Sequence, residues 1–269
     1  MQGEVLMDLG INGKVALVTA ASRGLGWSTA LRLSMEGARV AICSRDRERI
    51  EDAANRIREQ TRGEVSAFAG DVTDHDRIRE MVGEVRDAMG SLDILVCNAG
   101  GPPAGPHHDF SMDDYRSALE LNLLSTVNLC YETLPSMKDR RWGRIIAITS
   151  VAAKQPLDNL ILSNTARTGV LGFIKTLSSQ VAQFGITVNS LCPGYTKTER
   201  VEELARVFVR DGKGSEDEFY EKLYASIPAG RIGTPDEFAQ TAAFLASEGA
   251  AYITGVALQV DGGFYRGLM

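Results

Sequence analysis

The sequence predicts an α/β fold: a single doubly wound parallel-sheet domain over residues 1–269, with a small helical lid at about residues 200–229. Short runs of β-branched and aliphatic residues alternate with helix-like segments, which is typical of a parallel sheet with helices between its strands. No internal repeat and no linker rich in Pro, Gly or Ser divides the chain. Its 269 residues, 44% of them hydrophobic, suffice to bury one large core. Because crossovers between parallel strands are right-handed, we expect helices on both faces of the sheet.

Seven short runs have the length and composition of buried strands. They span residues 15–19, 39–43, 65–69, 94–97, 144–149, 187–191 and 256–260. Amphipathic spacing predicts helices between these strands. Those helices span residues 25–35, about 47–60, 77–88, 112–134, 160–184 and 236–246. The remaining helix-prone segment, 200–229, is polar and follows a late strand, where a segment of this kind can cover a site as a lid.

The chain is acidic, with 29 Lys and Arg against 35 Asp and Glu and a net charge of −6. Such a surface repels phosphate backbones, so we expect no nucleic-acid partner. No apolar run is long enough to cross a membrane, and residues 1–13 lack the order of a signal peptide. The four cysteines form no Cys-x-x-Cys pair, which favours reduced thiols and a cytoplasmic location. We expect no metal site, because the adjacent His107 and His108 have no further ligands.

A turn of small residues links the first strand to the first helix. The turn runs from Thr19 to Gly26 with the sequence Thr-Ala-Ala-Ser-Arg-Gly-Leu-Gly. Small side chains let the backbone approach a ligand, and the helix N-terminus adds unpaired N–H groups and a positive dipole end. These features predict a pyrophosphate cradle and hence a dinucleotide-binding Rossmann domain. The candidate cradle residues are Thr19, Ala21, Ser22, Arg23, Gly24, Leu25 and Gly26.

The turn resembles that of the short-chain dehydrogenase/reductase family, Thr-Gly-x-x-x-Gly-x-Gly, except that Ala20 replaces the first glycine. An alanine is accommodated there if its φ is negative. Further motifs of the family follow in order along nearly the whole chain. They are Asp71-Val72 at the adenine, Asn98-Ala99-Gly100 after the fourth strand, Asn122 in a helix, Pro193-Gly194 with Thr196 and Thr198 at the nicotinamide, and Asp261-Gly262-Gly263 near the C-terminus. The resemblance implies a nicotinamide cofactor, a small-molecule carbonyl or alcohol substrate, and a homo-oligomer, either a tetramer or a dimer.

The end of the second strand distinguishes the two nicotinamide cofactors. An acidic residue at this place binds the ribose 2′-hydroxyl of NAD. This sequence instead has Ser44 followed by Arg45, a pair suited to a 2′-phosphate. Arg23 adds a second cation on the same side, and Asp46 is expected to cap the next helix. We therefore expect NADP(H) rather than NAD(H).

The resemblance also implies a catalytic centre, in which two residue types are changed. The family uses a serine that polarises the carbonyl, a tyrosine that exchanges the proton, a lysine four residues later that binds the ribose, and an asparagine. Ser150 and Asn122 match the serine and the asparagine, whereas Ser163 and Arg167 stand in place of the tyrosine and the lysine. Arg167 can still donate to the ribose hydroxyls of the cofactor, so it is also a candidate cofactor-binding residue. The predicted helix 160–184 contains no tyrosine that a shift of register could supply. The spacing of four residues keeps both side chains on one helix face.

Three hypotheses follow from this altered centre. In the first, the protein is a carbonyl or 3-oxoacyl reductase: Ser150 and Ser163 bind the substrate oxygen, Arg167 stabilises the oxyanion, and a water delivers the proton. In the second, another residue has become the acid. The candidates are Lys154, Tyr195, Tyr224, His107 and His108. In the third, the protein is a catalytically silent NADP-binding sensor or scaffold. The paired change favours an enzyme, because it keeps two polar residues at the motif's spacing instead of losing the motif at random.

Overall fold

The computed structural model describes residues 8–268, and the strands of these residues form one seven-stranded parallel sheet. Its strand order is β3-β2-β1-β4-β5-β6-β7. The strands are β1 (Val15–Val18), β2 (Arg39–Ser44), β3 (Val65–Ala69), β4 (Leu92–Cys97), β5 (Gly143–Ile148), β6 (Ile186–Pro193) and β7 (Ala257–Val260). The predicted α/β fold with a doubly wound parallel sheet is therefore confirmed. Residues 1–7, the start of the segment considered for a signal peptide, lie outside the described residues.

The chain order reverses across the sheet between β1 and β4. β1 pairs with β2 on one side, where Val15 lies opposite Arg39, and with β4 on the other, where Val18 lies opposite Val96. In open α/β sheets a ligand binds outside the carboxyl ends of the strands at such a switch point. The segments that leave β1 and β4 here are the predicted phosphate turn and the segment 98–100.

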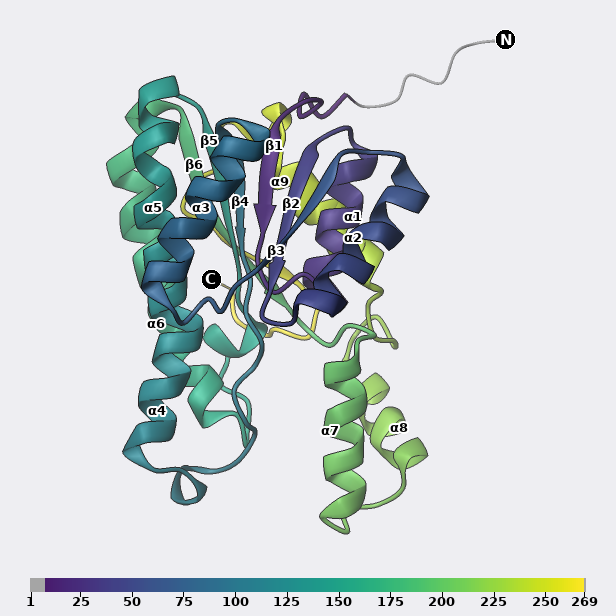
Figure 1. The fold of residues 1–269 in the computed structure, drawn as a ribbon. Helices are drawn as coiled ribbons and strands as arrows, with labels where there is room; N and C mark the ends of the chain where they lie inside the picture. Colours follow the sequence, from purple (N-terminus) through teal and green to yellow (C-terminus); the bar gives the residue numbers. More distant parts are fainter. Residues whose placement is uncertain (1–7, 269) are drawn as a thin grey trace.

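Helices cover both faces of the sheet (Figure 1). α1, α2 and α9 pack on one face through a core that includes Leu33, Ile57 and Phe238. α3, α5 and α6 pack on the other face around Met81 and Ile174. The helices are α1 (Gly24–Met35), α2 (Arg47–Thr61), α3 (His75–Met89), α4 (Met112–Leu119), α5 (Ser125–Arg140), α6 (Ile161–Val181), α7 (Glu199–Arg210), α8 (Glu216–Ser226) and α9 (Pro235–Ala246).

Two helical segments extend beyond the carboxyl ends of the strands, α4 on one side and the α7–α8 pair on the other (Figure 1). The α7–α8 pair occupies the segment predicted as a lid. Two main-chain bonds close its base: the Lys197 N–H donates to the Gly233 carbonyl at 2.9 Å, and the Gly233 N–H donates to the Tyr195 carbonyl at 2.9 Å. The pair therefore leaves and re-enters the sheet domain at one place.

The predicted helix 112–134 is longer and less regular than expected. α4 continues through a π-helical turn, Glu120–Leu124, into α5, which passes Pro135 and ends at Arg140. Proline lacks the N–H that continues a helix, which is the reason for an expected end at residue 134. Here only the carbonyl of Tyr131 loses its partner. Tyr131 is 74% exposed and so lies on the solvent side of α5, where a carbonyl without a helical partner is open to water.

Candidate active site

The turn between β1 and α1 has the geometry of a phosphate cradle. Gly24 begins α1 with a φ of +59°. Gly26 packs so tightly that a Cβ there would lie 2.6 Å from both the Ala20 carbonyl oxygen and Asn98 Nδ2. Only glycine fits such an approach. The first N–H groups of α1 have no partner within the helix and point out of its N-terminus toward the crevice.

Ala20 adopts a φ of +47°, in the left-handed region. An alanine was expected to fit here if its φ were negative, and this condition is not met. A left-handed alanine costs about 1–2 kcal/mol, because its Cβ crowds the following carbonyl oxygen. The Ala20 carbonyl accepts a hydrogen bond from Asn98 Nδ2 at 3.2 Å, which holds the strained turn in place.

Thr19 and Asn98 lie at the ends of β1 and β4 and bind each other. Thr19 Oγ1 donates to the Asn98 carbonyl at 2.7 Å and accepts from the Asn98 N–H at 2.9 Å. These two predicted cofactor residues thus use their polar groups to fix the phosphate turn against the segment 98–100. Their bonds set the shape of the crevice at the switch point.

The predicted 2′-phosphate site contains one free cation and one that is already paired. Ser44 Oγ donates to the Asp46 carbonyl at 3.2 Å, and Asp46 caps α2 as expected. Arg45 is exposed and forms no hydrogen bond or ion pair with another described residue. The Arg23 guanidinium forms an ion pair with Glu199 at the start of α7. Arg45 is therefore available to a ligand, whereas Arg23 has to leave its partner first.

The loop after β3 is shaped by its own aspartate. Asp71 Oδ1 accepts hydrogen bonds from the Thr73 N–H at 3.0 Å and the Thr73 hydroxyl at 2.9 Å. Val72 beside it is buried. Both predicted adenine-side residues thus lie in a fixed loop at the carboxyl end of β3.

The segment after β6 closes against the segment after β7. β6 ends at Pro193, and a Cβ at Gly194 would lie 2.6 Å from Asp261 Cβ. The Gly194 N–H donates to the carbonyl of the residue before Asp261 at 3.0 Å. Thr196 is buried, and Thr198 Oγ1 donates to its carbonyl at 3.2 Å. Glycine at 194 is therefore needed for the two segments to meet.

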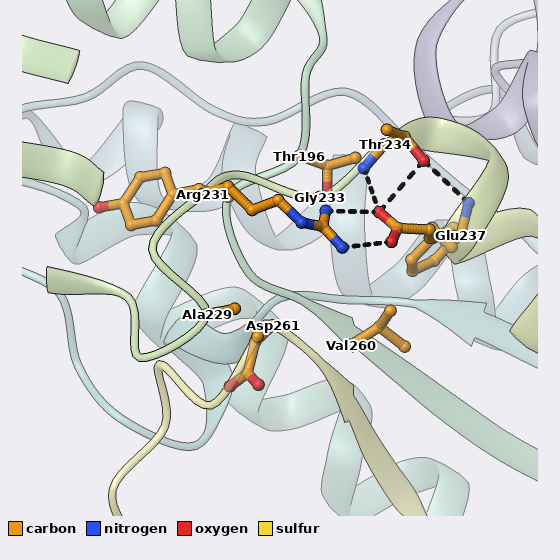
Figure 2. Close-up of a pocket in the computed structure, with 11 residues that line it drawn as sticks. Thr196, Ala229, Arg231, Gly233, Thr234, Glu237, Val260 and Asp261 are labelled. Carbon is orange, nitrogen blue, oxygen red and sulfur yellow. Dashed lines mark hydrogen bonds and ion pairs between the residues drawn. The ribbon is translucent and has the colours of Figure 1, made fainter. Parts of the chain in front are cut away.

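A cavity of about 150 Å³ lies beside this segment, between β7 and the start of α9 (Figure 2). Arg231 donates to both carboxylate oxygens of Glu237, at 2.9 and 2.6 Å, and the Thr234 N–H donates to Glu237 at 2.8 Å. The Arg231 guanidinium, and to a lesser extent the Thr234 N–H, lower the pKa of Glu237 to about 2. The cavity is smaller than the roughly 300 Å³ of the smallest typical ligand pockets. We assign these bonds to the base of the lid and no ligand to the cavity.

Arg167 reaches from α6 to the carboxyl ends of β4 and β5. Its Nη1 donates to the carbonyl oxygens of Ile148 at 3.0 Å and Thr149 at 2.9 Å, and its Nη2 lies 3.5 Å from that of Gly100. Asn122, in the π-helical turn, donates to the same Gly100 carbonyl at 3.0 Å. The Asn122 Oδ1 atom is buried and has no hydrogen-bond partner in the described part of the chain. The structure thus brings Arg167 and Asn122 together at Gly100.

The charge of Arg167 is buried without a counter-ion. The residue is 8% exposed, and no carboxylate between residues 8 and 268 forms an ion pair with it. Burial, together with the nearby positive charge of Arg200, lowers the pKa of Arg167 to about 10. The guanidinium therefore still carries its proton at neutral pH. A fixed charge in a dry site can stabilise negative charge that develops on a reacting atom.

The two serines of the predicted centre flank the connection from β5 to α6. Ser163 is buried, 7% exposed, one turn before Arg167, and its hydroxyl forms no hydrogen bond with another described residue. Ser150 Oγ accepts a hydrogen bond from the Ala152 N–H at 3.0 Å, which leaves its own proton free to donate. No hydrogen bond within residues 8–268 joins either hydroxyl to Arg167.

The residues considered as replacement acids are engaged elsewhere or exposed. Lys154 donates to the main chain of β7 at 3.3 Å, and His107 bonds to a tyrosine hydroxyl at 2.9 Å. Burial raises the pKa of Tyr195, which makes it a weaker acid. His108 and Tyr224 are exposed. None of the five forms a hydrogen bond or ion pair with the predicted catalytic residues in the described part of the chain.

Two residues that sequence analysis did not select lie at the crevice, Glu199 and Arg200 in the first turn of α7. Glu199 pairs with Arg23 in the phosphate turn, and Arg200 Nη2 donates to the Pro102 carbonyl at 3.1 Å. The first turn of α7 therefore contacts both sides of the switch point. Glu199 and Arg200 directly follow Thr198, a predicted cofactor residue, and this position in the sequence could have indicated them.

Some other site types find no support in the described residues. No helix among residues 8–268 is long and apolar enough to cross a membrane. Within the same range, no three or more His, Cys, Asp or Glu side chains group as metal ligands. The four cysteines are buried and free.

Comparison with known proteins adds to this geometry. A family model described as "Enoyl-(Acyl carrier protein) reductase" matches residues 19–265. An acetoacetyl-CoA reductase of Shinella zoogloeoides is 33% identical over 250 residues, 93% of this chain and 98% of its own. A 3-oxoacyl-(acyl-carrier-protein) reductase of Vibrio cholerae is 35% identical over 257 residues, 96% of this chain and 99% of its own.

Solved structures give the same picture. L-sorbose reductase from Gluconobacter frateurii, complexed with NADPH and L-sorbose, has a TM-score of 0.92 at 32% identity and covers 97% of this chain and 100% of its own. An actinorhodin polyketide ketoreductase with NADPH has a TM-score of 0.90 at 33% identity and covers 93% of this chain and 97% of its own. Both neighbours hold NADPH.

Proposed function

Because the chain belongs to the short-chain dehydrogenase/reductase family and is an oxidoreductase of that type, we propose that it is an NADPH-dependent carbonyl reductase with an altered catalytic centre. The observation that carries the proposal is the charge of Arg167, buried without a counter-ion at the ends of β4 and β5. Burying an unpaired charge is costly. A binding module would use it only to donate to the ribose of the cofactor, whereas a reductase also uses it on the oxyanion of its transition state.

The phosphate sites of the crevice fit NADP(H). The tight turn at Gly26 and the unpaired N–H groups of α1 fit a pyrophosphate. Ser44 and the free cation Arg45 would hold a 2′-phosphate, joined by Arg23 once it leaves Glu199. No acid at the end of β2 repels this phosphate. We therefore retain NADP(H) over NAD(H) as the proposed cofactor.

The remaining cofactor sites lie in the loops that follow the strands. Asp71 and Val72 would bound the adenine at the end of β3. The segments 98–100 and 193–198, which leave the sheet at the carboxyl ends of its strands, would hold the nicotinamide. When bound, the cofactor supplies the hydride.

In the proposed centre, Ser163 and Arg167 replace the family's tyrosine and lysine. Ser150, whose hydroxyl proton is free, would donate to the substrate carbonyl oxygen, with the Ser163 hydroxyl as a second donor. Arg167 would stabilise negative charge on that oxygen. Asn122 positions Arg167 through their shared contact with the Gly100 carbonyl. A serine hydroxyl is a poor acid, so water would deliver the proton, at a cost of about 10²- to 10⁴-fold relative to a placed general acid.

The surroundings of the site suggest its wider organisation. We infer that the chain is one domain, with α7 and α8 as its lid over the crevice. Exposed apolar side chains support a homo-oligomer, a dimer or a tetramer: Leu124 in the π-helical turn, Tyr131 on α5 and Leu258 on β7. Four buried free cysteines suit a reducing compartment, which supports a cytoplasmic location.

The first test is NADPH oxidation by the purified protein with β-oxo thioesters, diketones and keto sugars. Wild type is compared with Arg167→Gln, Ser150→Ala and Ser163→Ala, with Lys175→Gln on the exposed side of α6 as control. We expect turnover that falls by at least about 10²-fold in Arg167→Gln, since it loses an electrostatic contact of the transition state. Turnover that the Arg167 change leaves intact contradicts the proposal.

A second candidate is the NADP-binding sensor or scaffold. The observation that favours it is that no placed general acid adjoins Ser150 and Ser163 among the described residues. Fluorescence titration with NADPH separates the two functions. Tight NADPH binding without turnover of any carbonyl in the panel favours the sensor, and turnover excludes it.

A further inference from the structure

Two guanidinium groups lie against the same short loop at the carboxyl end of β4. Arg167 Nη2 lies 3.5 Å from the Gly100 carbonyl oxygen. Arg200 Nη2 donates to the Pro102 carbonyl at 3.1 Å, and a Cβ at Gly101 would lie 3.5 Å from the Arg200 Cζ, Nε and Nη2 atoms. Arg200 thus stacks on the residue that follows the Gly100 contact. The two cations come from different elements, α6 and α7, and meet at three consecutive residues.

The carboxylates of the described residues neutralise this pair only in part. Arg167 has no carboxylate partner within residues 8–268. Arg200 has one, Glu203, at 2.9 Å on its own helix, with the Glu203 side chain 59% exposed. An exposed pair of this kind contributes little. The whole chain carries a net charge of −6, so the local positive charge is not part of a basic surface. Two adjacent cations in a partly dry site favour an anion between them.

The place of the two arginines identifies the anion as part of the substrate. The pyrophosphate of a dinucleotide belongs at the N-terminus of α1, where Gly24 lies beside Thr198. Arg200 lies on the other side of the switch point, beyond Gly100, in the first turn of α7. Arg167 is the residue expected to stabilise the substrate oxyanion. A second cation beside it is suited to a carboxylate close to the reacting carbonyl.

We propose that Arg167 and Arg200 form an anion site beside the reacting carbonyl, and that the substrate is a short oxo acid with its ketone one or two carbons from a free carboxylate. This inference rests on the proposed reductase function. The reduction forms one C–H bond from the hydride and one O–H bond from a solvent proton, converts the oxo acid to a hydroxy acid, and oxidises NADPH to NADP⁺. The carboxylate itself is unchanged and serves only to bind and orient.

Binding gives the first test. The enzyme–NADPH complex is titrated with malonate, a non-reducible dianion, and with dimethyl malonate, its neutral counterpart, by calorimetry. We expect malonate to bind and the diester not to bind. Arg200→Gln should weaken malonate binding by about 10- to 100-fold, the effect of losing a hydrogen bond to a charged group, with NADPH affinity unchanged. Arg206→Gln, one turn and a half along α7 with a 71% exposed side chain, is the matched control.

Turnover gives the second test. Acetoacetate and methyl acetoacetate differ only in the free carboxylate, and the ratio of their kcat/KM values should favour the acid in wild type and collapse in Arg200→Gln through KM. An ester that binds or reacts as well as the acid overturns the anion site. A loss of NADPH affinity rather than malonate affinity in Arg200→Gln also overturns it, because the arginine then serves the cofactor. Malonate binding without any turnover supports the anion site but refutes the reductase. Turnover that prefers the ester supports the reductase but refutes the anion site.

Discussion

Replacing Arg167 with lysine tests whether a fixed positive charge at this position drives the reaction. Burial and the charge of Arg200 lower the pKa of Arg167 from its ordinary value to about 10. This lowering disfavours the charged form by about 3 kcal/mol. A lysine at the same place meets the same burial and the same neighbour, which would lower its ordinary pKa of about 10.4 to about 8. Wild type and variant should therefore lose their charge at different pH values.

The measurement is the pH dependence of kcat/KM for NADPH oxidation between about pH 6 and pH 10. We expect the Arg167→Lys variant to be active near pH 6 and to lose activity as pH rises through about 8, because the free enzyme then loses the ammonium proton. Wild type should hold its activity to about pH 10, where its own guanidinium titrates. The uncharged Arg167→Gln variant supplies the baseline, low at every pH.

Stability provides an independent check with a defined sign. The pKa of the lysine in the folded variant lies below its value in the unfolded chain, so between about pH 8 and about pH 10.4 the unfolded chain binds the additional proton. The stability of the variant should therefore rise with pH across this window relative to Arg167→Gln. If Arg167→Lys instead shows a flat activity profile at the wild-type rate, the charge is not needed at neutral pH or the site is not dry, and the reasoning fails.

Three further predictions concern the turn, the crevice and the base of the lid. Ala20→Gly should leave the free energy of unfolding in urea unchanged or raise it by up to about 1 kcal/mol, because it removes a left-handed alanine that costs about 1–2 kcal/mol, whereas the freedom of glycine in the unfolded chain costs about 0.5–1 kcal/mol. The control Ala21→Gly, at a residue without a positive φ, should lower the free energy of unfolding. An equal loss of stability in both variants contradicts this prediction. Glu199→Gln should tighten NADPH binding by about 2- to 5-fold, the scale of an exposed ion pair, and leave NADH binding unchanged, because Arg23 is freed for the 2′-phosphate; equal effects on both cofactors would refute it. The pKa of Glu237 is lowered from 4.5 to about 2, so its ion pair with Arg231 stabilises the fold above about pH 4.5, and this contribution fades as pH falls toward 2. The difference in Tm between wild type and Glu237→Gln should therefore shrink over that range. A constant difference would contradict the assignment of these bonds to the base of the lid.

The sequence predicted those helices, strands and turns that are determined by residues within or directly beside them. The strand–turn–helix from β1 to α1 follows from an aliphatic run and glycines, and the cap of α2 follows from Asp46 alone. The passage of α5 through Pro135 did not follow, because it depends on which side of the helix faces solvent. The left-handed conformation of Ala20 did not follow either, since the hydrogen bond that its carbonyl accepts comes from Asn98, directly after β4.

The site shows the same division between local and distant causes. The positions of Ser163 and Arg167 on one helix face follow from their spacing. The contact of Arg200 with Pro102 could not be predicted from the sequence, because it joins residues 98 apart in the chain. Its significance depends on a second fact that is also tertiary, the burial of Arg167 without a carboxylate. Long-range pairing of like charges leaves no periodic pattern in the sequence.

The presence of Arg200 also accounts for arginine rather than lysine at position 167. A buried lysine beside another cation would titrate at about pH 8 and would be partly uncharged at neutral pH. Arginine starts from a higher pKa and keeps its proton in the same place. An enzyme that acts on an oxo acid needs that charge at all times, since it must meet both the carboxylate and the developing oxyanion. In the proposed reductase, Arg167 and Arg200 therefore act together, and a permanent charge rather than a titrating acid would be the main source of rate.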